Sequence, residues 1–407
     1  MNSQAQIWFR LVPAYAAGYF LSYGLRSVNA VIAPELMQEM SITAAGLGLL
    51  TSAYFLSFGL FQLPLGLLLD RFGPRRVEAG LLLVAAVGCV LFATGTSLKT
   101  LAVARALIGL GVSACLMASF KAFSQWFPSE RLPSLTATIM VAGGLGALSA
   151  SVPVEAALPL LGWRGVFWVC AVLLTLTAGF LWTVPDKPVA SSGESLGQQI
   201  RALGSIYGNP IFWRFAPQGC LVVGGFMAIQ GLWAVPWLME VNGASRTDAA
   251  GTLLLLALSM LVGFLFVATC SGWLARRAIT PMMLLRTGMG LALVAELAII
   301  LKLAPPALLW PLLGITFSLG NIAYSQLSSA FPVSLSGRVN TALNLVVFVG
   351  AFSLQWGIGA AVDAFAAAGW SRTNAFQATL AALLTLQTLA FLWFLVPVKR
   401  GRKSGGV

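Results

Sequence analysis

Long apolar runs separated by short polar turns make up almost the whole chain. Six runs lie in the first half and six in the second: 9–33, 47–69, 77–96, 100–127, 132–158 and 163–184, then 211–239, 249–271, 281–301, 307–332, 338–366 and 373–397. A helix of about 20 apolar residues crosses the hydrocarbon core of a bilayer. The pattern therefore predicts an all-α membrane protein with twelve transmembrane helices.

A polar stretch divides these runs into two sets. We expect an N-terminal six-helix bundle over 1–184, a cytoplasmic linker over 185–209 and a C-terminal six-helix bundle over 210–407. The linker opens with PDKPVASSGES, a composition that is typical of disorder. Four apolar residues then recur at helical spacing: Leu196, Ile200, Leu203 and Tyr207. This spacing predicts a short helix on the membrane surface.

The basic residues are distributed unevenly between the two sides of the membrane. If both termini are cytoplasmic, sixteen of the 24 lysines and arginines fall on the cytoplasmic side and five on the outer side. The other three, Arg26, Arg105 and Lys121, lie inside apolar runs. An excess of Lys and Arg marks cytoplasmic loops. We therefore expect a multi-pass protein of the cytoplasmic membrane with both termini inside.

Composition excludes several classes of function. The net charge of +12 is spread over short loops and forms no basic stripe, so no nucleic-acid partner is expected. The chain has no histidine, and its five cysteines stand singly in apolar runs without metal-ligand spacing. No nucleophile–base constellation is present either. We expect no metal, no cofactor and no enzymatic activity.

The two halves resemble each other at an offset of 207 residues. Arg131 and Arg338 open the fifth and eleventh runs, and Gly162-Trp163 and Gly369-Trp370 close them. Parallel repeats related by an axis along the membrane normal place a transporter's binding site between its halves. The repeat therefore favours a transporter.

A charged loop joins the second and third runs: Gly66-Leu-Leu-Leu-Asp-Arg-Phe-Gly-Pro-Arg-Arg76. It resembles the G-x-x-x-D-R-x-G-R-R signature of the major facilitator superfamily. The matching residues are Gly66, Asp70, Arg71, Gly73 and Arg75, and Pro74 stands where the family usually has a basic residue. The alternative is a positive-inside loop with a capping aspartate.

This resemblance implies two six-helix bundles related by a pseudo-two-fold axis, alternating access, and a central cavity lined by spans one, four, seven and ten. It also implies that Asp70 lies near the N-terminus of the eleventh helix in one conformation and leaves it in the other. The matching residues of the loop would then act as a conformational switch.

Arg26 is the leading candidate for substrate binding. It lies in the first span, and Tyr19, Tyr23 and Asn29 share its face of the helix. Charges inside spans are expensive and usually functional. The alternative is an ion pair, because two glutamates, Glu35 and Glu39, follow in the same helix.

The other two intramembrane cations lie in span four. Arg105 belongs to a stretch that resembles the family's R-x-x-x-G-x-G motif. This resemblance implies that Arg105 faces the cavity and takes part in coupling or gating. The alternative is an ion pair with Glu155. On a straight helix Lys121 points about 160° away from Arg105 around the axis. It reaches the same cavity only if Gly109 and Gly111 bend the span. Otherwise its side chain extends to the cytoplasmic edge of the membrane.

The C-terminal half offers neutral polar groups. Gln230 and Trp233 lie in span seven, where Trp233 is equivalent to Arg26, and Asn321 and Tyr324 lie in span ten. Each could contact a substrate, although hydrogen bonding between helices is the alternative. Asp363 matches Glu155 at the outer end of a span, and together with Lys121 these acids are candidates for coupling.

A cavity with cations and no central acid favours anions. We therefore predict a monomeric secondary transporter of a small anionic solute, an organic acid, coupled to a proton or to a second anion. Three alternatives are weighed against it. A nitrate or nitrite porter would carry arginines in spans two and eight, which have none. Efflux of hydrophobic or cationic compounds requires an acid in the cavity, such as Glu155 or Asp363. A non-transporting receptor is the third.

Overall fold

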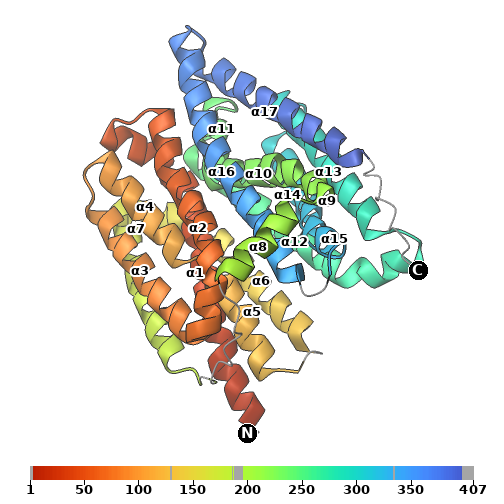
Figure 1. Ribbon diagram of the computed structural model, residues 1–407. Helices are drawn as coiled ribbons and strands as arrows, with labels where there is room; N and C mark the ends of the chain where they lie inside the picture. Colours follow the sequence, from red (N-terminus) through yellow and green to blue (C-terminus); the bar gives the residue numbers. More distant parts are fainter. Residues whose placement is uncertain (1–2, 129–130, 186, 188–195, 333–334, 397–407) are drawn as a thin grey trace.

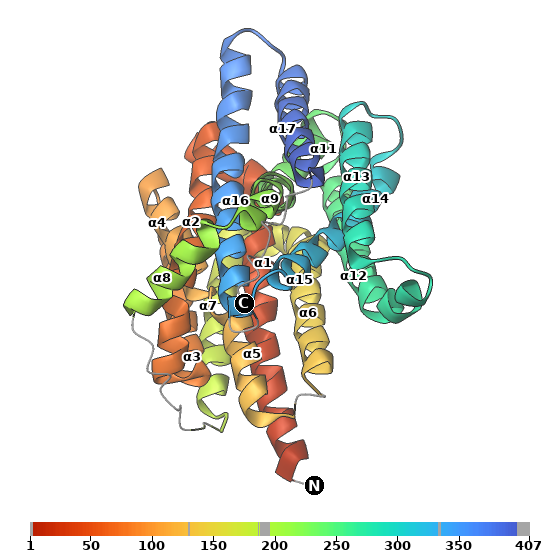
Figure 2. The same cartoon turned by 45° about the vertical axis from the view of Figure 1, so that its right-hand side comes forward.

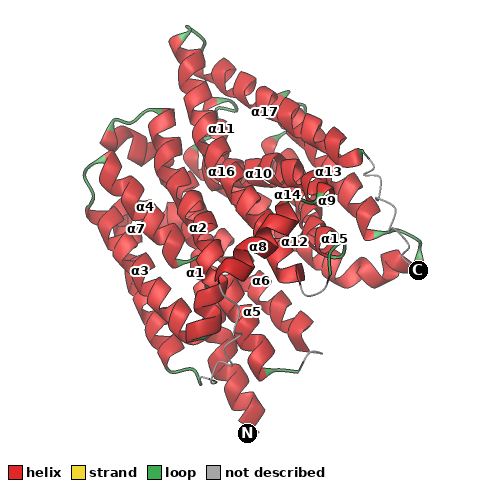
Figure 3. Cartoon of the chain, in the orientation of Figure 1, coloured by secondary structure: helices red, strands yellow, loops and turns green. Residues whose placement is uncertain are grey.

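The computed structural model describes residues 3–128, 131–185, 187, 196–332 and 335–396. All regular structure in these ranges is helical (Figure 3). The N-terminal half contains seven helices: α1 (Ser3–Met40), α2 (Ala44–Phe72), α3 (Pro74–Thr94), α4 (Leu98–Gly111), α5 (Cys115–Trp126), α6 (Leu132–Ser149) and α7 (Val152–Trp182). The expected disorder at the start of the linker falls largely on 186 and 188–195, outside the described residues.

The linker helix α8 (Leu196–Tyr207) forms where the apolar spacing predicted it. The C-terminal half then contains the following elements: α9 (Pro210–Gln218), the π-helical η2 (Gly219–Val223), α10 (Gly224–Ala228), the π-helical η3 (Ile229–Trp233), α11 (Ala234–Glu240), α12 (Arg246–Arg276), α13 (Pro281–Ile300), α14 (Pro306–Ser318), the 3₁₀ turn η4 (Leu319–Asn321), α15 (Ile322–Ser328), α16 (Ser336–Ala367) and α17 (Arg372–Leu395).

These helices account for the predicted apolar runs and confirm the all-α membrane fold. Ten helical stretches within the described residues are long and apolar enough to cross a membrane. Runs five and six meet inside α7, where Gly162 has a φ of 61° and kinks the helix. Only glycine adopts this left-handed conformation without a steric penalty, so Gly162 is the point at which the chain reverses.

The two halves lie side by side. In Figures 1 and 2, α1–α7 form one group and the helices after α8 form the other, while α8 crosses in front of them. Helix α16 packs along α2 across the boundary, and α12 packs against α6. Small residues permit the close approach: a Cβ atom on Gly48 would lie 2.7 Å from the Gln355 carbonyl oxygen, and one on Gly59 would lie 2.8 Å from Cβ of Phe348.

Two of the spans expected to line the cavity are irregular. Residues 112–114 interrupt span four between α4 and α5. Two side chains from other helices satisfy carbonyl groups there: Ser22 Oγ donates to Val112 O (3.4 Å) and Gln62 Nε2 donates to Ser113 O (3.1 Å). Span seven contains two π-helical turns, η2 and η3. Such irregularities inside a membrane protein concentrate at functional sites.

Candidate functional site

Arg26 lies on α1 at the boundary between the halves. Its side chain is half-buried, and its guanidinium carbon is 4.5 Å from the ring centre of Tyr23, 5.4 Å from that of Phe58 and 5.6 Å from that of Phe348. Phe348 belongs to α16 and hence to the other half. Nε of Arg26 has no hydrogen-bond partner among the described residues, and no ion pair to Arg26 is found there. The guanidinium is therefore held by aromatic faces rather than by a carboxylate.

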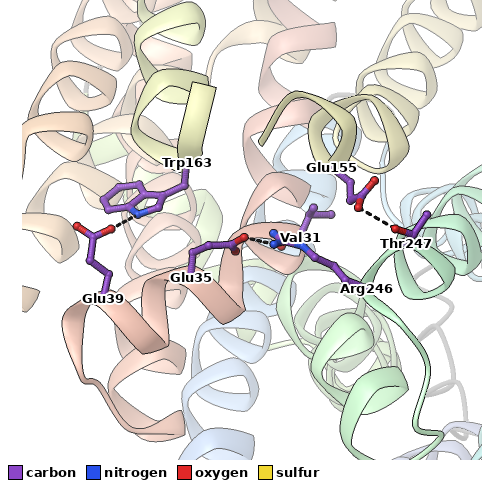
Figure 4. Close-up of polar contacts among 7 residues, drawn as sticks. All are labelled: Val31, Glu35, Glu39, Glu155, Trp163, Arg246 and Thr247. Carbon is purple, nitrogen blue, oxygen red and sulfur yellow. Dashed lines mark hydrogen bonds and ion pairs between the residues drawn. The ribbon is translucent and has the colours of Figure 1, made fainter. Parts of the chain in front are cut away.

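The two glutamates that follow Arg26 on α1 are paired elsewhere (Figure 4). Glu35 forms an ion pair with Arg246 of α12, which also donates to Val31 O at 2.8 Å. Glu39 pairs with Arg164 and accepts a 2.6 Å hydrogen bond from the indole of Trp163. In this structure neither carboxylate neutralises Arg26.

Arg105 is 1% exposed and braces α4 against α1. Its Nη1 donates to Leu25 O at 3.0 Å, next to Arg26, and the guanidinium lies 5.0 Å from the ring centre of Tyr54. Glu155, the alternative partner, instead accepts a 3.0 Å hydrogen bond from Thr247 of α12. Arg105 is thus positioned to orient the helix that carries Arg26, and in this conformation it is closed off from solutes.

The charged loop between α2 and α3 is tied into the N-terminal half. Asp70 pairs with Lys121 of α5, so the break in span four leaves Lys121 near the loop and not beside Arg26. Gly73 joins the two helices with a φ of 80°. Arg75 donates to Val184 O at 2.9 Å, and Arg71 is exposed. The switching role of this loop, Gly66 included, stays a prediction.

The remaining candidates differ in how accessible they are. Tyr19 is buried with its ring 5.1 Å from that of Tyr23. Asn29 is buried, and both of its amide atoms lack partners among the described residues. Tyr324 is half-buried, lies within electrostatic range of Arg26 and donates to Asn344 Oδ1 at 3.0 Å.

Gln230 and Trp233 are buried and occupied. Gln230 Nε2 is 3.2 Å from Met260 Sδ, and the indole of Trp233 donates to Gln355 O at 2.9 Å. Asn321 is exposed. The structure therefore brings Tyr19, Tyr23 and Tyr324 close to Arg26. Gln230 and Trp233 instead make contacts between helices, which is the alternative that the sequence left open.

Several polar contacts between the halves lie at one end, which the predicted topology makes the outer end. Asp363 of α16 accepts hydrogen bonds from the first backbone amides of α2, at 3.3 Å from Ala44 N and 2.7 Å from Ala45 N. The Glu35–Arg246 and Glu155–Thr247 contacts lie at the same end (Figure 4). Glu155 and Asp363 thus each bind the start of a helix of the opposite half, and neither of these contacts reaches Arg26.

Sequence reasoning missed several residues of this region. Phe58 and Phe348 give no signal of their own, because apolar residues are everywhere in these spans. Glu78 of α3 is fully buried, with neither carboxylate oxygen hydrogen-bonded among the described residues. It follows directly after the basic loop, and the sequence alone does not distinguish this buried position from the membrane interface.

Comparisons with known proteins agree with this architecture. The family model described as Major Facilitator Superfamily matches residues 15–354. A bacterial homologue of the human lysosomal transporter Spinster, solved in an inward-facing and occupied conformation, superposes with a TM-score of 0.76 at 17% identity, covering 94% of this chain and 95% of that one. The D-xylose–proton symporter superposes with a TM-score of 0.75 at 15% identity, covering 95% and 97%.

Curated relatives match over part of their length. The protein named "Probable sulfoacetate transporter SauU" of Cupriavidus necator is 31% identical over 193 residues, 47% of this chain and 44% of that protein. The hexuronate transporter of Escherichia coli K12 is 28% identical over 179 residues, 44% of this chain and 40% of that protein. The aligned region thus spans less than half of each relative. The family match covers most of the chain, and with the fold it shows that this protein belongs to the major facilitator superfamily of transporters.

Proposed function

We propose that this protein carries a small organic anion across the cytoplasmic membrane by alternating access, with Arg26 as the principal binding residue. The observation that supports this most strongly is the half-buried guanidinium of Arg26, which has no carboxylate partner among the described residues. A cation inside the membrane is costly unless an opposite charge reaches it. A carboxylate or sulfonate would supply that charge through paired N–H···O bonds.

The surroundings of Arg26 fit an anion with a carbon skeleton. The rings of Tyr23 and Phe58 come from the N-terminal half, and that of Phe348 comes from the C-terminal half. A solute bound between them would contact both halves, so its binding energy would depend on how closely the halves approach. Asn29 and Tyr324 add polar groups for hydroxyl or carboxyl substituents.

The named relatives support the same class of solute, since sulfoacetate and hexuronate are both organic anions. Cation efflux is less well supported, because Glu155 and Asp363 bind helix starts at one end. With cytoplasmic termini, the polar contacts of Glu35, Glu155 and Asp363 between the halves lie at the outer end, and on this basis we assign the structure to an inward-facing state. We further propose that the protein works as a monomer and couples transport to a proton or to exchange of a second anion.

The test is uptake by purified protein in proteoliposomes. Radiolabelled sulfoacetate, glucuronate and tartrate are offered singly, with nitrate and tetraphenylphosphonium as competitors. We expect uptake of at least one organic anion, competition by its analogues, and none by the cation. Arg26→Ala should weaken binding about 10- to 100-fold, the value of a charge-assisted hydrogen-bonded contact. Arg26→Lys should restore part of it, because lysine keeps the charge and loses the paired geometry.

Arg201→Ala is the matched control, because Arg201 is an exposed arginine on the linker helix α8. Uptake by this variant should equal that of the unmodified protein. Normal anion uptake by Arg26→Ala would remove Arg26 from the site. Inhibition by tetraphenylphosphonium together with no uptake of any anion would overturn the proposed solute class.

A further inference from the structure

A buried acidic side chain of the N-terminal half contacts α1 eight residues before Arg26. Glu78, near the start of α3, is 0% exposed, and neither of its carboxylate oxygens has a hydrogen-bond partner within the described part of the chain. Its side chain rests against Gly18 of α1, where an added Cβ atom would overlap Oε1. The thiol of Cys115, the first residue of α5 after the break in span four, is its titratable neighbour. Gly18 therefore makes room for a carboxyl group that has no paired cation among the residues that the structure describes.

An ionised carboxylate in such surroundings is strongly disfavoured. It has lost its hydration, and among the described residues the facing group is the Cys115 thiol, a weak donor, with no ion pair to replace the lost water. The stable form in this conformation is the neutral carboxylic acid. Glu78 thus holds one proton in a compartment bounded by α1, α3 and α5.

The groups that act on Glu78 from the neighbouring helices are few. The facing thiol is that of Cys115 on α5, and Tyr19 and Arg26 of α1 act electrostatically on that thiol. Further along α3, Arg105 of α4 and Cys170 of α7 lie near Cys89. Arg75 on α3 itself donates to Val184 O. No carboxylate–cation pair that would keep Glu78 ionised is found in the described part of this region.

We propose that Glu78 is the proton-binding residue that couples anion transport to a proton. One proton from water adds to the carboxylate to give the carboxylic acid in the anion-loaded state. The same proton is carried through the conformational change and leaves to water on the other side in a later step that exposes Glu78, which is closed off in the conformation described here. A monovalent anion would then move with one proton and no net charge. This proposal rests on the proposed function, since it assumes that an anion binds at Arg26.

The coupling between the two sites is electrostatic. Gly18 and Arg26 are eight residues apart on α1, about 12 Å at 1.5 Å per residue. A negative charge on Glu78 at about that distance, in an effective dielectric of roughly 20, lowers the affinity of Arg26 for an anion about tenfold. Protonation of Glu78 removes this repulsion. By reciprocity, a bound anion favours the proton on Glu78 to the same extent.

The experiment compares Glu78→Gln with the unmodified protein in proteoliposomes, using whichever of sulfoacetate, glucuronate and tartrate is taken up fastest. Glutamine mimics the protonated acid permanently. We expect Glu78→Gln to lose accumulation driven by a pH gradient while it keeps exchange of internal for external anion. In detergent, the dissociation constant of the unmodified protein should rise about tenfold with increasing pH. That of Glu78→Gln should be independent of pH.

Glu296→Gln is the matched control, because Glu296 is a buried acid of α13 in the other half and lies far along the chain from α1. It should accumulate anion as the unmodified protein does. Accumulation by Glu78→Gln equal to that of the unmodified protein would overturn the proposal. So would an anion affinity of the unmodified protein that is constant with pH, a measurement that needs no variant. Failure of the inference alone would leave Arg26-dependent uptake intact, whereas absence of any anion uptake would end both proposals.

Discussion

The contact of Asp363 with α2 gives the most direct test of how the outer end is held closed. The carboxylate accepts from Ala45 N at 2.7 Å and from Ala44 N at 3.3 Å, so it caps the N-terminus of a helix that belongs to the opposite half. A helix cap contributes about 1 kcal/mol. A negative charge at a helix N-terminus adds about 0.3–1 kcal/mol. We therefore expect Asp363→Ala to destabilise the closed outer end by about 1–2 kcal/mol, which shifts the ratio of closed to open molecules by about 5- to 30-fold.

The measurement is a distance distribution between two spin labels across the outer end. Labels at Leu160 of α7 and Leu303, which follows α13, would report on opposite halves, since both side chains are largely exposed. The five native cysteines would be replaced first. Asp363→Ala should increase the population at long distance, whereas Asp363→Asn, which keeps an acceptor oxygen but not the charge, should have a smaller effect.

Glu240→Ala serves as the control for Asp363→Ala. It removes an exposed acid at the end of α11 in the same half, so the charge of the outer end changes equally without loss of the cap. The distribution for this variant should match that of the parent. An unchanged distribution in Asp363→Ala would refute the view that this cap holds the halves together.

Two further predictions concern the packing on which the site depends. Arg246→Ala should also open the outer end, by up to about 1 kcal/mol because the pair with Glu35 is partly exposed, and the same spin-label pair measures it. Arg246→Lys keeps the charge and loses the paired donors, so a distance distribution for Arg246→Lys equal to that of the parent would contradict a role for the guanidinium bond to Val31 O. Gly109→Ala should lower the melting temperature in detergent, because the added Cβ would lie 2.8 Å from Cα of Tyr54. Gly179→Ala is the control, because a Cβ there meets no atom within 4 Å, and it should leave the melting temperature unchanged. Equal melting temperatures of the two variants would contradict this account.

The architecture could be predicted from the sequence because the bilayer imposes it. Each apolar run must form a helix, and basic residues mark the loops that stay inside. Arg26 could be identified for the same reason, since a cation within a span is conspicuous. The sequence could not show that Arg26 forms no ion pair with Glu35 or Glu39. That outcome depends on Arg246 and Arg164, which reach the two glutamates from other helices.

Other features depend on packing that one helix does not reveal. Gly109 and Gly111 suggested a bend in span four, and the interruption falls just after them at 112–114, where side chains of α1 and α2 satisfy the carbonyls. The burial of Glu78 depends on a glycine of α1 that is distant in sequence. The sequence could not show that the indole donor of Trp233 reaches a carbonyl of α16, and the role of Trp233 in substrate binding stays a prediction.

The two π-helical turns of span seven give that helix a second way to move. A π turn holds one more residue than an α turn, so converting η2 or η3 to α-helix would advance the following side chains by one position, about 100° around the axis. Trp237, about one turn beyond η3 and about four turns beyond η2, would then face a different neighbour. Rotation of the part of the helix beyond the π turn would thus replace the face that span seven presents to α1 without a hinge.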